Sequence, residues 1–274
     1  MNDKVMEFSV LLSVYGKEKP EFLEVALQSI WDDQLLKPNE IVIVKDGALT
    51  IGLENVLEKF SRKAPTKFVV LSANVGLGLA LREGVKQCSF EWIARMDTDD
   101  VAHPARFLKQ ITFLRKNPNI AILSSWIDEF IGTKENIVST RKVPSDHQSC
   151  IKMLKYGCPL NHPSVVFKKK AVINAGNYKS FFLKEDAYLW LRLYAKNYKF
   201  ANVNESLLYF RVSEEMYKRR GGYKYAKSEV KILFYRYKIG LISFLEFMLY
   251  VGLTVPVRLA PSKIRLFIYT KILR

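Results

Sequence analysis

Cysteine and histidine are scarce in this sequence of 274 residues. The three cysteines, Cys88, Cys150 and Cys158, are too few and too irregularly spaced for a disulfide framework, and none lies in a Cys-x-x-Cys pair. The three histidines show no spacing typical of a zinc site. Internal repeats and low-complexity linkers are also absent from the sequence. We therefore expect a cytoplasmic globular protein whose thiols are reduced.

Acidic residues are also few. The sequence has 27 aspartates and glutamates against 43 lysines and arginines, which gives a net charge of +16. The excess is concentrated at the end, where 14 basic residues from Arg211 onward accompany four acids. A basic surface can bind nucleic acid, a membrane or an acidic ligand. Because no recognition motif accompanies the charge, we expect no nucleic acid among the partners. No basic leader with a cleavage site precedes the first apolar run, so we expect no secretion.

Short apolar runs alternate with segments of helical spacing in the first hundred residues. The runs lie at Phe8–Val14, Ile41–Val44, Lys67–Leu71 and Trp92–Met96, and they indicate buried parallel strands. Between them, apolar residues recur every three or four positions, as in amphipathic helices. This alternation predicts an α/β fold with a doubly wound sheet and helices on both faces. Ligands bind such sheets at the carboxyl ends of the strands.

A second, more mixed set of elements follows. A proline suited to a first helical turn starts a helix expected over about Pro104–Asn117. Shorter β-like runs lie at Ile120–Ser124, Ile137–Val143 and Ser164–Phe167, and a further helix is expected over Asp186–Tyr198. We therefore expect strands and helices added to the parallel part of the sheet.

Three aspartates within four residues, Asp97, Asp99 and Asp100, follow the fourth expected strand. Neighbouring carboxylates repel one another unless a cation or hydrogen-bond donors neutralise them. Mn²⁺ or Mg²⁺ takes one or two protein carboxylates and completes its shell with water and phosphate oxygens. The cluster therefore indicates a site for one of these ions. The alternative is a solvated acidic turn before the next helix, because aspartate is favoured at helix starts.

Further motifs follow the other expected strands. Tyr15-Gly16 follows the first strand, Lys45-Asp46-Gly47 the second, and Asn74-Val75-Gly76-Leu77-Gly78 the third. Together with Asp97-Thr98-Asp99-Asp100, this ordered set resembles glycosyltransferase family 2 over roughly residues 8–220. The resemblance implies an inverting, metal-dependent enzyme with the α/β, GT-A-like fold of nucleotide-diphospho-sugar transferases.

The resemblance also implies roles for single residues. Asp46 would hydrogen-bond the nucleotide base, Asp97 would contact the ribose and diphosphate, and Asp99 and Asp100 would be the metal ligands. The other residues expected to contact the nucleotide sugar are Ser13, Val14, Tyr15, Asn74, Gly76, Arg82 and Thr98, together with Asp99. Two alternatives stay open, because Asp46 also suits a turn with the following glycine and Arg82 also suits an ordinary surface position.

Two other nucleotide-binding classes are disfavoured. Gly76 and Gly78 form a Gly-x-Gly pair, but the dinucleotide-binding fingerprint needs a further glycine where this chain has Leu81. A sugar nucleotidyltransferase would resemble its family by a glycine- and lysine-rich loop after the first strand, which the segment from Tyr15 to Pro20 lacks. A membrane-associated binding module that kept the fold and lost turnover is the alternative of a different class.

An inverting glycosyl transfer needs a base that takes the proton from the acceptor hydroxyl. Lys184-Glu185-Asp186, followed by Trp190 and Arg192, resembles the family's Glu-Asp motif with its downstream tryptophan and arginine. The resemblance implies Asp186 as the base and Glu185 as a helper or acceptor ligand. It also places His162, Trp190 and Arg192 on the acceptor side. The alternatives are an acidic first helical turn for the two carboxylates and a local hydrogen bond for His162.

The end of the chain combines apolar and basic residues. Between Lys238 and Arg258 the one charged residue is Glu246, and the length approaches a membrane span of about 20 residues. Glycines, Pro256 and the acid argue against crossing. Upstream, Lys224, Lys227, Lys231 and Lys238 share one helical face, and basic and apolar residues are interleaved over 263–274. The pattern is typical of interfacial helices on an anionic leaflet. The alternative is packing on the catalytic domain with solvated lysines.

We therefore expect a catalytic domain over residues 1–220 and a basic helical extension over 221–274. Within the first, about 1–103 would bind the nucleotide and about 104–220 the acceptor. The resemblance implies a UDP-sugar donor, with UDP-galactose or UDP-glucose favoured, and Mn²⁺ or Mg²⁺ as cofactor. It also implies a polyprenyl-diphosphate-linked saccharide as acceptor, in O-antigen or capsule synthesis. The protein would be peripherally attached to the inner face of the cell membrane.

Three arginines near the end of the catalytic domain leave two alternatives open. Arg211, Arg219 and Arg220 either close over the phosphates or are surface charges.

Overall fold

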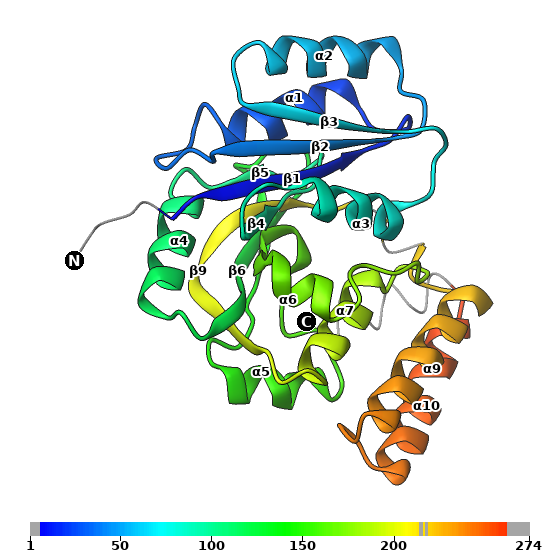
Figure 1. Ribbon diagram of the computed structural model, residues 1–274. Helices are drawn as coiled ribbons and strands as arrows, with labels where there is room; N and C mark the ends of the chain where they lie inside the picture. The colour runs from blue at the N-terminus through cyan, green and yellow to red at the C-terminus, as the bar shows by residue number, and fades with distance from the viewer. Residues whose placement is uncertain (1–5, 214–215, 217–218, 262–274) are drawn as a thin grey trace.

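The computed structural model describes residues 6–213, 216 and 219–261 of the chain. Over these residues it forms a nine-stranded mixed sheet covered by helices, with two long helices standing apart at one end (Figure 1). The interleaved basic and apolar residues expected over 263–274 lie outside the described residues.

The first half of the sheet is parallel, in the order β3-β2-β1-β4. Its strands are β1 (Phe8–Val14), β2 (Glu40–Asp46), β3 (Thr66–Leu71) and β4 (Trp92–Arg95). The helices that connect them are α1 (Pro20–Ile30), α2 (Ile51–Ser61) and α3 (Leu77–Gln87). This arrangement confirms the expected strands and the doubly wound connection. The carboxyl ends of β1, β2 and β4 therefore meet at one edge of the sheet.

The second half is mixed and continues the sheet as β4-β8-β6-β9-β5, with β7 beside β6. Its strands are β5 (Val101–Ala102), β6 (Ile120–Phe130), β7 (Ile137–Arg141), β8 (Val166–Lys168) and β9 (Lys199–Arg211). Its helices are α4 (Arg106–Lys116), α5 (His147–Leu154), the short 3₁₀ turn η1 (His162–Ser164), α6 (Lys169–Asn174) and α7 (Glu185–Tyr194). Because β4 pairs with β8 in antiparallel fashion, the added strands extend the parallel half instead of forming a second sheet.

Several expected boundaries differ from the structure, and the largest shift is that of β6, the strand expected to end at Ser124, which ends at Phe130. The helix expected from Pro104 begins at Arg106, so the proline precedes its first turn. Ser164 belongs to η1 and not to the following strand. The helix expected to reach Tyr198 ends at Tyr194, because Asn197 adopts a left-handed backbone with φ 60° and turns the chain into β9.

Two apolar clusters fill the two faces of the sheet. Successive residues of β1 point to opposite faces, so Val10 and Leu12 contribute to one cluster and Leu11 to the other. The first cluster contains the buried apolar residues of α1, α2 and α4, and the second contains those of α3 and α7 together with Ile232 of α9. The central strands of the sheet are therefore buried on both sides, and the strand ends remain to form a site.

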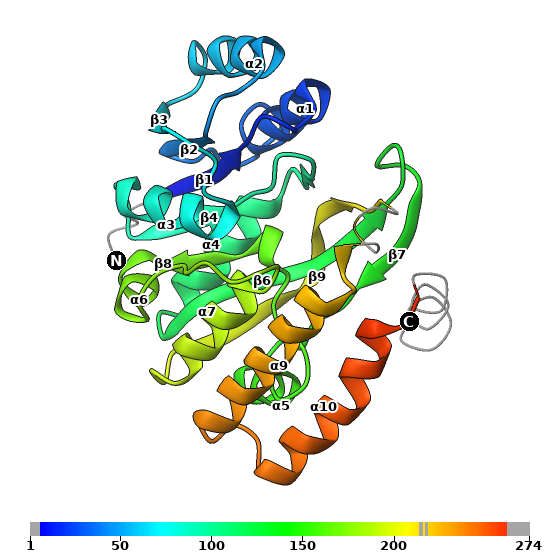
Figure 2. The same ribbon diagram turned by 90° about the vertical axis from the view of Figure 1, so that its right-hand side faces the viewer.

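The last two described helices are α9 (Tyr223–Lys238) and α10 (Phe244–Leu259). They form a hairpin in which α9 packs against α7 and α10 lies outermost (Figure 2). Glu246, the acid within the apolar segment, completes a capping box with Ser243 at the start of α10. No helix among the described residues is both long and apolar enough to cross a membrane.

Candidate active site

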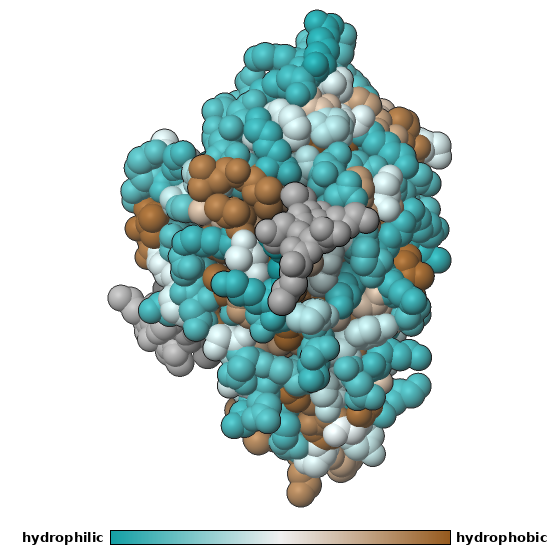
Figure 3. All heavy atoms as spheres, turned by 60° about the vertical axis from the view of Figure 1, so that its left-hand side comes forward, coloured by the Kyte–Doolittle hydropathy of each residue, from teal (hydrophilic) through white to brown (hydrophobic). Residues whose placement is uncertain are grey.

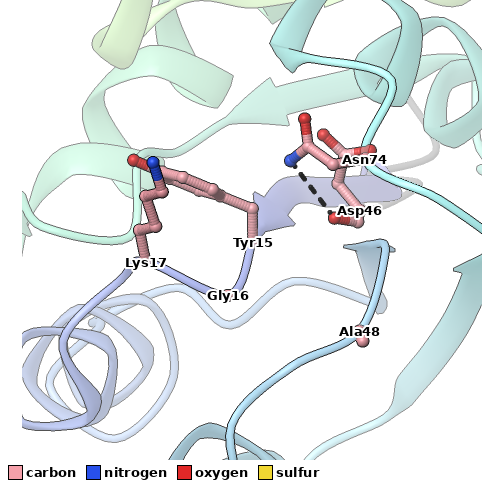
Figure 4. A pocket seen from close by; sticks show the side chains of 6 residues that line it. All are labelled: Tyr15, Gly16, Lys17, Asp46, Ala48 and Asn74. Atoms are coloured by element: carbon pink, nitrogen blue, oxygen red, sulfur yellow. Dashed lines mark hydrogen bonds between the residues drawn. The ribbon is translucent and has the colours of Figure 1, made fainter.

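A pocket of about 310 Å³ opens at the carboxyl ends of β1 and β2. It is lined by Tyr15, Gly16 and Lys17 from the loop after β1, by Asp46 and Ala48 from the end of β2, and by Asn74 from the loop after β3 (Figure 4). The two loops approach closely, since a Cβ on Gly16 would lie 2.7 Å from the carbonyl oxygen of Ala48. The pocket thus joins three of the motifs that follow separate strands in the sequence.

Asp46 is buried at the base of this pocket. Its carboxylate accepts hydrogen bonds from the backbone N–H groups of Val75, at 2.7 Å, and Gly76, at 3.1 Å. The side chain of Asn74 donates in turn to the carbonyl of Asp46, at 3.3 Å. Gly76 and Gly47 both have positive φ, which permits this close contact between the loops. Asp46 therefore connects the β2 loop to the β3–α3 loop while it faces the pocket.

Three other residues expected to contact the nucleotide are not part of the lining of this pocket. Ser13 is half-buried on β1, and Val14 is fully buried in the core beneath the pocket. Arg82 is exposed on α3, and the described residues show no contact of its side chain with the acidic cluster. The roles expected for these three residues stay predictions.

Asp97, Asp99 and Asp100 are brought together after β4. One carboxylate oxygen from each lies within 4.8 Å of the others. Beneath them Arg95, 2% exposed, forms a two-pronged ion pair with Asp97. The guanidinium of Arg95 therefore neutralises Asp97. Among the described residues, Asp99 and Asp100 have no such ion pair.

Burial and mutual repulsion raise the pKa values of the remaining pair. The pKa of Asp99 rises to about 6, through burial and then the charge of Asp97. The pKa of Asp100 rises well above its usual range, through burial and then the charge of Asp99. One oxygen of Asp100, Oδ2, is buried and accepts no hydrogen bond from the described residues. Clustered hard oxygens with an unpaired buried member fit a divalent cation such as Mn²⁺ or Mg²⁺.

Arg211, at the end of β9, anchors this loop. Its backbone N–H donates to Asp100 Oδ1 at 2.9 Å, and its Nε donates to the carbonyl of Asp99 at 2.9 Å. The guanidinium lies over the rings of Phe22 and Phe130, with its carbon 3.9 and 4.6 Å from their centroids. Arg211 therefore fixes the acidic loop through its backbone and side chain, which differs from a free surface charge, and its expected contact with the phosphates stays a prediction.

Glu18 is a member of the site that sequence reasoning missed. Burial and the charge of Asp99 raise its pKa to about 7, although a hydrogen bond with buried Thr98 acts in the opposite direction. Glu18 follows the Tyr15-Gly16 motif in the same loop after β1. Its place after a parallel strand could have indicated it, because all such loops meet at one edge of the sheet.

Glu185 and Asp186 form the first turn of α7, which faces the same edge. A Cβ on Gly78, at the start of α3, would lie 3.1 Å from the Cβ of Glu185. Burial, and then the charge of Asp186, raise the pKa of Glu185 to about 7, while Arg95 and Asp97 contribute smaller effects. Asp186 accepts a hydrogen bond from the N–H of Ala187 at 2.7 Å. The structure thus brings the two acidic motifs, some 90 residues apart in sequence, into electrostatic contact.

The residues expected on the acceptor side are buried more deeply in the protein than Glu185 and Asp186. His162 is buried, its Nε2 is 2.9 Å from the hydroxyl of Tyr178, and its ring packs edge-on against Trp190. Burial lowers the pKa of His162 well below its usual range, so the ring is neutral. Trp190 is fully buried, and Arg192 donates to the carbonyl of Ala175 at 2.6 Å. The acceptor-side roles expected for these residues stay predictions, and the contacts shown here link them to the placement of α7.

Comparison with known proteins gives consistent matches. The sequence model of glycosyl transferase family 2 matches residues 9–176. The chain is 38% identical to the UDP-Gal:alpha-D-GlcNAc-diphosphoundecaprenol beta-1,3-galactosyltransferase of Escherichia coli, over 100% of this chain and 99% of that protein. It is 36% identical to an amylovoran biosynthesis glycosyltransferase of Erwinia amylovora, over 96% and 98%. A Pyrobaculum calidifontis mannosyltransferase solved with GDP-Man and Mn²⁺ has a similar fold, with TM-score 0.65 and 14% identity over 97% of this chain and 75% of that one.

Proposed function

The chain belongs to glycosyl transferase family 2, and we propose that it transfers a hexose from a UDP-sugar to a saccharide on a polyprenyl diphosphate. UDP-galactose is the favoured donor and UDP-glucose the second. The observation that carries the proposal is that Glu185, beside Asp186 in the first turn of α7, packs against the start of α3 and is within electrostatic range of Arg95 and Asp97. The similarity to the Escherichia coli galactosyltransferase supports the donor and the lipid-linked acceptor.

The proposed reaction is a single displacement with inversion. The acceptor hydroxyl oxygen forms a bond with the anomeric carbon as the bond from that carbon to the UDP oxygen breaks. Asp186 takes the proton from the attacking hydroxyl, and Glu185 orients the acceptor. Asp97, held by Arg95, contacts the ribose and diphosphate, and Asp46 contacts the base. A Mn²⁺ or Mg²⁺ ion held by Asp99 and Asp100 would supply positive charge for the leaving diphosphate.

The test is UDP release by the purified full chain from UDP-galactose and UDP-glucose. The acceptor is N-acetylglucosamine on a short alkyl diphosphate, assayed with and without EDTA. We expect release that depends on acceptor and stops in EDTA. Full activity in EDTA would remove the metal ion from the proposal, and Asp186→Asn turning over normally would remove the base. UDP binding without transfer to any acceptor would favour the inactive binding module instead.

We also propose peripheral attachment to the inner face of the cell membrane, in surface polysaccharide synthesis such as that of O-antigen or capsule. Apolar side chains gather at the lower tip of the molecule, where α9 and α10 join (Figure 3). On α10 the exposed apolar residues include Leu245, Leu249 and Leu253, which are 80%, 57% and 62% exposed. Such an exposed apolar stripe supports interfacial binding. The start of α9 at Tyr223 supports a boundary between the catalytic domain and the extension near residue 220.

A further inference from the structure

A second pocket, of about 320 Å³, lies between α9 and the loop that precedes α7. From the loop it is lined by Ser180, Phe181 and Phe182, and from α9 by Lys224, Lys227, Ser228 and Lys231. The three lysines are three and four positions apart in sequence, which places them on one face of the helix. The pocket therefore combines three ammonium groups with two aromatic rings.

The charges of these lysines are not compensated within the described part of the chain. Lys224, Lys227 and Lys231 are exposed, and none forms an ion pair with a described carboxylate. The nearby acid on α9, Glu229, is instead occupied by Lys184 at 2.9 Å and Arg258 at 2.7 Å. Three like charges around one cavity repel each other, and a multiply charged anion bound between them removes that repulsion.

The pocket is attached to the proposed catalytic base. Ser228 Oγ donates to the carbonyl of Phe182 at 2.7 Å, and the ion pair of Lys184 with Glu229 fastens the same loop to α9. Asp186 follows Phe182 by four residues, a stretch of chain that spans at most about 14 Å when extended. An anion held by the lysines is therefore near the group that takes the proton.

We propose that Lys224, Lys227 and Lys231 bind the diphosphate of the lipid-linked acceptor, an inference that rests on the proposed function. The diphosphate then holds the saccharide toward Asp186, and the hydrocarbon chain leaves along the exposed apolar side of α9 and α10. Lysine suits this task because its ammonium group binds phosphate oxygens as a compact charge without demanding one orientation. The donor diphosphate is a separate ligand, since its proposed site is the Asp97–Asp100 cluster at the strand ends.

The experiment compares the full-length wild type with the triple variant Lys224→Gln/Lys227→Gln/Lys231→Gln in solution without vesicles. Two acceptors are used, N-acetylglucosamine on a short alkyl diphosphate and the same sugar on a short alkyl chain without phosphate. For the diphosphate acceptor we expect KM to rise by roughly tenfold or more, because charge-assisted contacts are lost. The KM for the UDP-sugar and the rate with the phosphate-free acceptor should not change.

A matched control removes three positive charges elsewhere. Lys116, Lys170 and Lys196 are exposed and lie outside both pockets, so changing all three to Gln tests the effect of net charge alone. An unchanged KM in the pocket variant, or an equal rise in the control, would overturn the proposal. Because vesicles are absent, a loss seen here cannot come from binding to lipid headgroups in a leaflet.

A binding measurement separates this proposal from the proposed reaction. The alkyl diphosphate sugar is titrated into each protein by calorimetry without any donor. Weaker binding by the pocket variant alone supports the site even if the wild type transfers none of the tested hexoses. Equal binding by all three proteins overturns the site even if transfer is observed.

Discussion

At the scale of single residues, the three clustered aspartates differ in what neutralises them. Asp97 has the buried guanidinium of Arg95, whereas Asp100 has a backbone N–H on one oxygen and no donor on the other among the described residues. Removing the charge of Asp97 should therefore destabilise the protein, whereas removing that of Asp100 should not.

Asp100→Asn should leave the free energy of unfolding unchanged or raise it, because it removes a repelled buried charge and keeps an oxygen for the N–H of Arg211. Asp97→Asn should lower that free energy by about 3 kcal/mol, because Arg95 loses its buried partner. Both variants should lose at least about 100-fold in transfer rate. Urea unfolding without metal, and UDP release with Mn²⁺, measure the two effects. Equal destabilisation by the two variants would contradict this distinction.

Glu185 should make stability depend on pH. Burial and the charge of Asp186 raise its pKa from the ordinary 4.5 to about 7. Because the folded value exceeds the unfolded one, the contribution to stability is fully present below 4.5 and is lost as the pH rises through about 7. Glu185→Gln cannot ionise, so its stability relative to wild type should rise by on the order of 2 kcal/mol from about pH 5 to about pH 8. Urea unfolding at both pH values measures this.

The control for that experiment is Glu58→Gln, which removes an exposed carboxylate from α2. If Glu185→Gln differs from wild type by the same amount at both pH values, the environment inferred for Glu185 is wrong.

The sequence was sufficient to locate the two acidic motifs, because their residues are contiguous and follow recognisable elements. It did not reveal Glu18 near Asp99, or Arg211 on the acidic loop, because both contacts join distant segments. Nor did it show that Trp190 is fully buried. A tryptophan one turn after an acidic motif can face either solvent or the core, and only packing decides between them.

At the scale of elements, the position of α7 depends on the ion pairs of α9. Glu229, 7% exposed, accepts from Lys184 just before α7 and from Arg258 on α10. One carboxylate therefore joins three elements.

Glu229→Gln should lower the free energy of unfolding by about 2–3 kcal/mol. This is less than the usual cost of breaking a fully buried ion pair, because Lys184 and Arg258 are partly exposed. It should also reduce kcat, because the loop before Asp186 loses its attachment. Thermal unfolding and UDP release measure these effects. The matched control is Glu246→Gln, which removes a half-buried acid from the neighbouring helix and keeps a side chain that suits the capping box. An unchanged kcat would show that α7 is positioned without α9.

The parallel strands were predictable as elements, since each is a short apolar run between helices of clear periodicity. The pairing of strands in the second half of the sheet was not predictable from the sequence. The sheet order β4-β8-β6-β9 depends on pairings between strands far apart in sequence, such as Ile122 with Phe167. Period-two patterns identify the buried face of a strand and contain little information on which strand lies beside it.

At the scale of the whole molecule, the basic and apolar residues of the hairpin are separated. The three lysines at the pocket face the loop before α7, whereas α10 has no buried residue over its described length. The membrane proposal therefore depends chiefly on α10, and the lysines of α9 are available for the proposed contact with the acceptor diphosphate.

Deleting the chain after about residue 239 would be a poor test of membrane binding, because it also removes the ion pair of Arg258 with Glu229. Substituting exposed leucines avoids this. In Leu245→Gln/Leu249→Gln/Leu253→Gln the changed residues lie four positions apart on one face of α10. We expect binding to vesicles containing anionic lipid to weaken by at least about tenfold, because each leucine loses apolar burial in the interface. The transfer rate to a short-chain acceptor in solution should stay the same.

The matched control changes Leu35, Ile51 and Val70 to Gln, since these are 69%, 81% and 71% exposed but lie on other elements. Co-sedimentation with vesicles over a range of salt concentrations measures both variants. If the α10 variant sediments like wild type at every salt concentration, the exposed leucines do not bind the membrane. If only the control loses binding, the membrane-facing surface lies on the nucleotide-binding half. Loss in the α10 variant alone would place the hairpin against the leaflet, where a lipid-linked acceptor would enter beside Phe182 and the α9 lysines.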